Sequence, residues 1–225
     1  MRWETLLKVM EEEARKRHAP VFRKNLRNAF KVLIFTILSA RSRDELTYKV
    51  AERLFTVIKT PAQLANMKVK DVEKLIYPIG FYKIKAKRLV ECAKLLTTRY
   101  NSEVPKTYEE LIKLPGVGRK TANVVLANAF GKPALGVDVH VHRIANRLGL
   151  VKTVKPEETE EGLKKIIPAR YLAQVNKIFV AYGQTICKLK PKCNECKIRE
   201  YCRYYKLNLK SLSNKNLVHN KTNTN

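Results

Sequence analysis

Four cysteines lie close together near the C-terminal end of the sequence, within sixteen residues, with five, two and five residues between them: Cys187, Cys193, Cys196 and Cys202. Four thiolates at such a spacing can ligate one zinc ion or one iron–sulfur cluster. Zinc ribbons usually carry two CxxC pairs, and this segment has one. The spacing therefore favours an iron–sulfur cluster over zinc.

A glycine turn at Leu114–Arg119, LPGVGR, is the second feature with chemical potential. Pro115 ends one predicted helix, running into Leu114, and a second predicted helix begins near Arg119. Glycines at 116 and 118 allow backbone angles that other residues resist. A tight turn beside a helix N-terminus exposes backbone N–H groups, which suits a phosphate oxygen and reads no base sequence. A turn that only packs two helices together is the alternative.

A lysine and an aspartate follow this turn. Lys120 falls in the first turn of the second predicted helix, and Asp138 follows Gly136-Val137 in the segment VDVHVHRIANRLGL. Any single lysine is most often a solvated surface residue. The amine is nevertheless a potential nucleophile, and a carboxylate can stabilise a developing positive charge.

Together, LPGVGRKTANVVL and VDVHVHRIANRLGL resemble the endonuclease III family, within the helix-hairpin-helix DNA glycosylase superfamily. The resemblance covers Trp3 to Cys202. It implies that Lys120 is the nucleophile, assisted by Asp138, and that Gly116, Val117, Gly118 and Arg119 bind the DNA backbone.

The implied activity is bifunctional base excision. A damaged base must leave the stack before it can be cut off. Lys120 would add to C1′ and form a Schiff base, and β-elimination would then break the strand, which is lyase activity at an abasic site. The expected substrates are oxidised pyrimidines and abasic sites in double-stranded DNA.

The resemblance also assigns further residues. Ser39 and Asp44 match the lining of the damage pocket, and Phe81 matches an apolar wedge, although a core aromatic is an equal alternative. Arg41 stands where bacterial members have a gap-filling glutamine, so the opposite-base preference stays open. His140 would contact DNA; it and His142 can equally be structural histidines.

The cysteine spacing resembles the [4Fe–4S] loop of the family, with a first interval one residue shorter than usual, so we expect a tighter loop. Basic residues crowd it and would face DNA phosphates: Lys188, Lys190, Lys192, Lys197 and Arg199. The remaining cysteine, Cys92, lies in LVECAKLL and is expected to pack in a helical core.

The elements that must position these residues read as helices. Leu6, Leu7, Met10 and Ala14 form one apolar helix face, and segments 21–40, 45–58, 69–77 and 84–100 show similar spacing. The predicted fold is all-α, with two helical domains. By resemblance, residues 22–132 form a barrel with the hairpin at about 111–126, residues 1–21 and 133–206 form the cluster domain, and 207–225 form a mobile polar tail.

Composition limits the possible functions. Forty-six lysines and arginines against twenty acidic residues give a formal net charge of +26, which indicates a polyanionic partner, although lysine-rich composition alone explains part of it. The longest apolar stretch, 32–40, is too short for the roughly 20 residues of a membrane span. Because residues 1–17 lack the apolar core of a signal peptide, we expect the protein in the cytoplasm, associated with the nucleoid. We also expect a monomer.

Two rival functions remain open at this point. One is a monofunctional mismatch glycosylase of the same superfamily, in which another residue generally replaces the lysine at 120. The other is a non-catalytic iron–sulfur protein that binds DNA and senses redox state. An excision assay separates these possibilities.

Overall fold

The structure is a computed structural model that describes residues 2–22, 26, 28–42 and 44–209, with only the backbone of Asp44 described. These residues form helices joined by turns, and none of them lies in a strand, so the predicted all-α fold is confirmed. The chain divides into two compact units. We call residues 23–136 with 172–174 the hairpin unit, and residues 1–22, 137–171 and 175–225 the cysteine unit.

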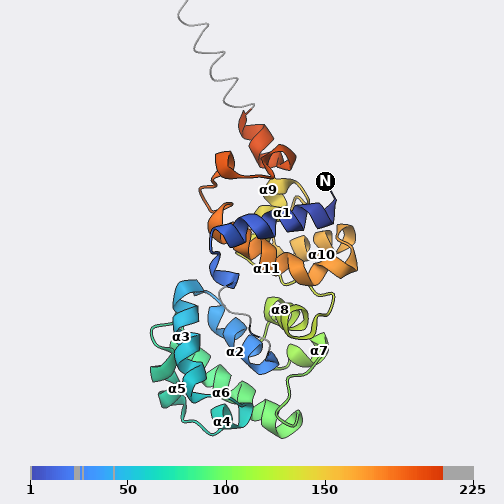
Figure 1. Cartoon of the computed structure of the whole chain (residues 1–225). Helices are drawn as coiled ribbons and strands as arrows, with labels where there is room; N and C mark the ends of the chain where they lie inside the picture. Colours follow the sequence, from blue (N-terminus) through green and yellow to red (C-terminus); the bar gives the residue numbers. More distant parts are fainter. Residues whose placement is uncertain (1, 23–25, 27, 43, 210–225) are drawn as a thin grey trace, which may run out of the picture. The chain divides into compact units, whose positions relative to one another are not determined.

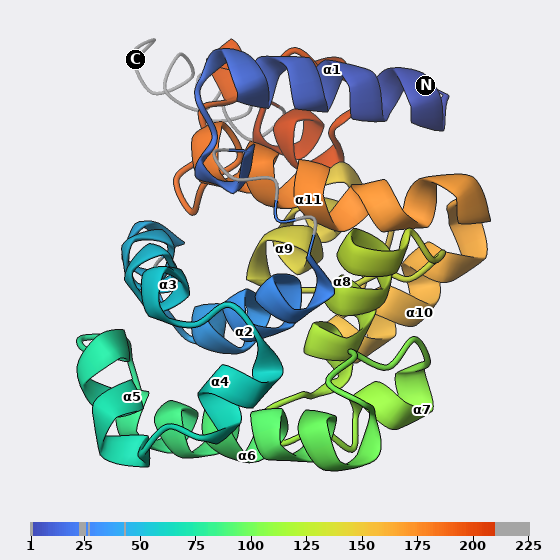
Figure 2. The same ribbon diagram turned by 60° about the horizontal axis from the view of Figure 1, so that its bottom comes forward.

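The helices of the hairpin unit surround one apolar core (Figures 1 and 2). In chain order they are α2 (Ala29–Ser39), α3 (Asp44–Val57), α4 (Pro61–Ala65), α5 (Val69–Ile76), α6 (Tyr82–Arg99), α7 (Tyr108–Leu111) and α8 (Arg119–Phe130). The central helix is α2, which packs against α3, α6 and α8. Its sequence AFKVLIFTILS is apolar nearly all round because it is covered on most sides.

Two sequence-predicted helix bounds were wrong. The segment 21–40 is not one helix: Pro20–Phe22 form a 3₁₀ turn, and α2 begins only after Asn28, whose side chain accepts a hydrogen bond from the Lys31 N–H at 3.1 Å. The helix expected to run into Leu114 ends at Leu111. Hydrogen-bonded turns then carry the chain to Val117.

The cysteine unit contains α1 (Trp3–Lys16), α9 (Val139–Leu148), α10 (Pro156–Ile166) and α11 (Ala169–Thr185), of which residues 172–174 group with the hairpin unit. The predicted apolar face of α1 is buried as expected. Ala14 packs against Ala181 of α11, and α9 packs against α10. Short 3₁₀ turns at Cys193–Glu195 and Arg199–Tyr201 carry the cysteine loop, and residues 203–209 are helical.

The expected tail therefore overlaps a helix at 207–209, and the rest of it, 210–225, lies outside the described residues. Within the described ranges, no helix is both long and apolar enough to cross a membrane. Cys92 is fully buried in the hairpin unit, as predicted, and burial raises the pKa of its thiol to about 12.

Candidate functional site

The two glycines of the turn at 114–119 suit their positions for different physical reasons. Gly116 has a φ of 85°, and a Cβ there would meet Ile37 and Arg88 atoms at 3.3 and 3.4 Å. Gly118, the N-cap residue of α8, has ordinary extended backbone angles, and a Cβ there would meet nothing within 4 Å. The fold therefore requires glycine at 116, whereas the open space beside Gly118 leaves room for a ligand to approach the helix end.

The amides at this helix end define what the turn can bind. The Val117 N–H donates to the Leu114 carbonyl at 3.0 Å, and the Val117 side chain is buried, so this residue stabilises the turn itself. The first intrahelical bond of α8 runs from the Ala122 N–H to the Gly118 carbonyl, at 2.9 Å. The preceding amides have no partner within the helix and carry its partial positive charge. The geometry suits a phosphate oxygen.

Lys120 is the second residue of α8 and its side chain is half-buried. Its backbone carbonyl lies 3.1 Å from the position of a Cβ on Gly136, where only a glycine lets the chain pass α8 so closely. Within the described residues of the hairpin unit, the Lys120 amine makes no hydrogen bond or ion pair. Its three donor positions are thus not committed to holding the unit together.

Asp138 caps the N-terminus of α9 in the cysteine unit. One carboxylate oxygen, Oδ1, accepts from the N–H groups of His140 at 2.9 Å and Val141 at 3.0 Å. The cap fixes the carboxylate in one orientation and stabilises its negative charge. Since a single oxygen satisfies both amides, the second oxygen can interact with a cationic group.

Arg41 and Phe81 are the exposed residues of two neighbouring turns in the hairpin unit. Arg41 has a φ of 51° and Phe81 a φ of 60°, both in the left-handed region. The Arg41 guanidinium carbon lies 6.0 Å from the centre of the Phe81 ring, at the limit of a cation–π contact. Phe81 is 58% exposed, so the alternative of a core aromatic is wrong.

The other sequence-predicted residues are placed as follows. Ser39 ends α2 and its hydroxyl donates to the Thr36 carbonyl at 2.9 Å, while the Asp44 side chain lies outside the described residues. The His140 ring packs on Gly183 of α11 and contacts Arg143 at 3.0 Å. His142 pairs with the buried Thr159 hydroxyl at 2.6 Å. Both histidines therefore have structural partners.

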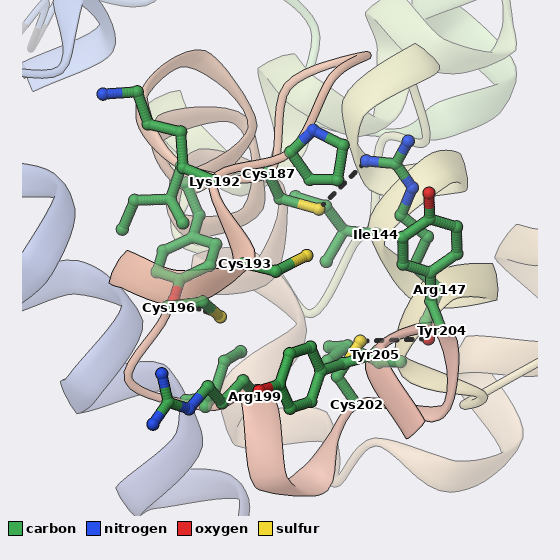
Figure 3. Close-up of a pocket in the computed structure, with 15 residues that line it drawn as sticks. Ile144, Arg147, Cys187, Lys192, Cys193, Cys196, Arg199, Cys202, Tyr204 and Tyr205 are labelled. Atoms are coloured by element: carbon green, nitrogen blue, oxygen red, sulfur yellow. Dashed lines mark hydrogen bonds between the residues drawn. The ribbon is translucent and has the colours of Figure 1, made fainter. Parts of the chain in front are cut away.

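The four clustered cysteines line one cavity at the end of α11 (Figure 3). All four are half-buried and free of disulfide bonds: Cys187, Cys193, Cys196 and Cys202. Burial raises the pKa of the Cys193 thiol first of all, and the negative charges of the other three cysteines raise it further. No group of three or more His, Cys, Asp or Glu side chains in the described ranges is arranged to hold one metal ion.

Hydrogen bonds to sulfur surround this cavity. The Tyr182 hydroxyl lies 3.2 Å from Cys196 Sγ, and the Arg147 guanidinium donates to Cys187 Sγ at 3.4 Å. Burial, followed by the contact with Cys196, raises the pKa of Tyr182, so the hydroxyl keeps its proton to donate. Such donors stabilise thiolate sulfur, so the chemistry of this lining fits an iron–sulfur cluster.

Sequence reasoning missed the two arginines that hold the cysteine loop. Arg143 donates to the Cys187 carbonyl at 2.9 and 3.1 Å, and Arg147 donates to the carbonyls of Lys188 at 2.6 Å and Leu189 at 2.8 Å. They stand four residues apart on α9, the helix that Asp138 caps, and so share one helix face. That spacing was the available signal. One helix therefore presents the capping carboxylate and anchors the loop.

Residues 34–169 match the HhH-GPD superfamily of base excision DNA repair proteins. Endonuclease III of Thermotoga maritima is 52% identical over 178 residues, which cover 79% of this chain and 84% of that protein. Endonuclease III of Escherichia coli strain K12 is 37% identical over 186 residues, covering 82% and 88% respectively.

Solved structures agree with the sequence relatives. A trapped covalent intermediate of endonuclease III with DNA superposes with a TM-score of 0.80 at 36% identity, over 93% of this chain and 99% of that chain. A non-covalent complex of endonuclease III with DNA gives a TM-score of 0.78, also at 36% identity, over 93% and 100% of the two chains.

Proposed function

Because the chain belongs to the HhH-GPD superfamily of base excision DNA repair proteins, with endonuclease III enzymes among its relatives, we propose that it is a bifunctional glycosylase and lyase. Membership makes it a base excision DNA repair enzyme. The proposal concerns its chemistry, namely the nucleophile, the lyase step and the cofactor. The observation that carries it is the amine of Lys120, the second residue of α8, which makes no hydrogen bond or ion pair within the described residues of the hairpin unit.

Lys120 is the proposed nucleophile. Its neutral amine attacks C1′ of a flipped-out damaged nucleotide, the glycosidic bond breaks, and the base leaves with the bonding electron pair and takes up a proton. Opening of the sugar ring then gives a Schiff base between Nζ and C1′. Loss of a C2′ proton expels the 3′ phosphate oxygen, which is β-elimination, and hydrolysis of the imine frees the enzyme.

Asp138 is the proposed electrostatic partner of this reaction. Breaking the glycosidic bond builds positive charge on the sugar, and a fixed carboxylate stabilises that charge without reorganising. The two hydrogen bonds that Oδ1 accepts from backbone N–H groups hold the carboxylate in one orientation. In this role Asp138 matters most for base excision and less at a site whose base is already gone.

The proposed DNA contacts around the reacting groups are of two kinds: contacts to the phosphate backbone and contacts at the damaged nucleotide. The amides at the start of α8, with Arg119, hold a backbone phosphate, which positions any sequence equally. Arg41 and Phe81 enter the duplex where the damaged nucleotide has left. His140 contacts the DNA, and Ser39 and Asp44 border the pocket. The proposed substrates are oxidised pyrimidines and abasic sites in double-stranded DNA.

The cysteine loop is proposed to hold a [4Fe–4S] cluster, with Cys187, Cys193, Cys196 and Cys202 as ligands. Four half-buried thiols around one cavity, with hydrogen-bond donors to two sulfurs, support this ligand set. When bound, the cluster supplies structural cross-linking of the loop, which presents its lysines to DNA.

Borohydride trapping tests the proposal. Added during reaction with a thymine glycol duplex, it reduces a Schiff base to a stable amine and so yields an enzyme–DNA adduct. We expect the adduct with the wild-type protein and none with Lys120→Gln, which should still bind the duplex. Efficient excision by the wild type without any adduct would favour the monofunctional alternative, with water as the nucleophile.

A further inference from the structure

The two turns that carry Arg41 and Phe81 lie against each other. A Cβ on Gly80 would come within 3.2 Å of the Arg41 carbonyl oxygen, so the backbone of one turn nearly touches that of the other. Each turn lies at the end of a helix: Arg41 follows the C-terminus of α2, and Phe81 is the N-cap residue of α6. Two exposed side chains, both on strained left-handed backbone, are thereby brought to one place.

Lys85 lies directly beneath these turns and is 6% exposed. Its ammonium donates to the Leu38 and Ala40 carbonyls, at 2.7 Å each, which are unpaired groups at the C-terminal end of α2. Its backbone N–H donates to the Phe81 carbonyl at 3.0 Å. One residue therefore ties the Arg41 turn through its side chain and the Phe81 turn through its backbone.

A buried ammonium is costly unless its hydrogen bonds repay the lost hydration. Burial lowers the pKa of Lys85 to about 8, in the direction that this lost hydration dictates. An apolar side chain of similar length, such as methionine, would avoid it but would leave both carbonyls of the α2 end without this donor. Burying the Lys85 ammonium thus costs folding stability but fixes the position of the Arg41 turn.

We propose that Lys85 is a positioning residue, which locks the Arg41 and Phe81 turns together so that both side chains enter a damaged duplex as one preassembled pair. The inference rests on the proposed function of these two residues. Lys85 itself touches no DNA. It acts by removing the cost of ordering two mobile side chains at the moment of insertion.

A consequence separates this role from general stabilisation. Ordinary duplex offers no space for insertion, so binding to it depends on phosphate contacts alone. A duplex with a tetrahydrofuran residue, a stable abasic analogue, offers the space. Loss of Lys85 should therefore lower the ratio of the affinity for the tetrahydrofuran duplex to that for intact duplex, and change binding to intact duplex little.

The test measures this affinity ratio by fluorescence anisotropy for wild type, Lys85→Met, Phe81→Ala and the double variant. The matched control is Lys87→Met, which removes an equal charge from an exposed position of the same helix. A second readout is the fluorescence of 2-aminopurine placed opposite the tetrahydrofuran, which rises as this base is unstacked. Circular dichroism melting checks the fold, and Lys85→Gln replaces Lys85→Met if the latter unfolds at the assay temperature.

We expect Lys85→Met to lower the affinity ratio at least about fivefold and to reduce the 2-aminopurine signal, while Lys87→Met changes neither. In the Phe81→Ala background the same change should have less than about a twofold effect, because the pair is already broken. An unchanged ratio in Lys85→Met, or equal losses in both backgrounds, would overturn the role of Lys85. A wild-type protein that does not prefer the tetrahydrofuran duplex would instead refute the proposed function.

Discussion

Replacing Gly118 by aspartate tests the phosphate site at the start of α8. The new side chain fits without a clash, since a Cβ there meets no atom within 4 Å, and the extended backbone suits any residue. The fold should therefore survive. The carboxylate, however, occupies the space through which a phosphate would approach the amides.

The expected loss follows from the repulsion of two like charges. At a separation of about 4 Å it is about 1 kcal/mol in a water-like dielectric and about 4 kcal/mol near a protein surface. DNA affinity should fall by about fivefold to several hundredfold. Because one phosphate contact is lost, the slope of log affinity against log salt should become shallower by about 0.9.

Fluorescence anisotropy across a salt series measures both quantities, on damaged and on undamaged duplex. The matched control is Gly118→Asn, which adds a side chain of nearly the same size at the same open position without its charge. We expect similar losses on both duplexes for Gly118→Asp and a much smaller loss for Gly118→Asn. Unchanged affinity and slope in Gly118→Asp, with the fold intact, would refute the site.

Four further outcomes are expected. Anaerobically purified protein should be brown and contain about four irons per chain, and one zinc per chain without sulfide would contradict the cluster. Cys196→Ser should destabilise the cysteine loop more than it lowers the rate of base excision. In single-turnover assays, Asp138→Asn should slow excision of thymine glycol strongly and cleavage at an abasic site less, and equal slowing of both would remove its electrostatic role. Burial lowers the pKa of Lys85 from 10.5 to about 8, so between these pH values the unfolded protein binds a proton at Lys85 that the folded protein does not. Urea denaturation should therefore show that wild type gains stability relative to Lys85→Met as the pH rises from about 8 to 10.5. A difference in unfolding free energy that does not change with pH would mean that the ammonium is not desolvated.

Much of the fold could be predicted from the sequence because its helices are amphipathic. Leu6, Leu7, Met10 and Ala14 recur at helical spacing, and all are buried in α1. The start of α2 was predicted wrongly because the apolar pattern extends beyond it. Val21 and Phe22 are apolar, but α2 begins after its N-cap residue, Asn28. Local capping decides such a boundary, and a periodic pattern does not show it.

The site divides in the same way. The glycines of the turn and the four cysteines could be identified because their residue types and spacing carry the chemistry. Tyr182 and Lys85 could not, since each acts through a tertiary contact with a sulfur or a backbone carbonyl distant in sequence. A single lysine in a helical sequence looks like a surface residue, and only its burial shows otherwise.

The measurement that tests the central claim most directly is the location of the covalent bond to DNA. The adduct trapped by borohydride on a thymine glycol duplex is digested with nuclease and trypsin, and the modified peptide is sequenced by mass spectrometry. The account predicts a sugar remnant on Nζ of Lys120, with tryptic cleavage blocked after this residue. A remnant on any other residue, or an adduct that persists in Lys120→Gln, would contradict it.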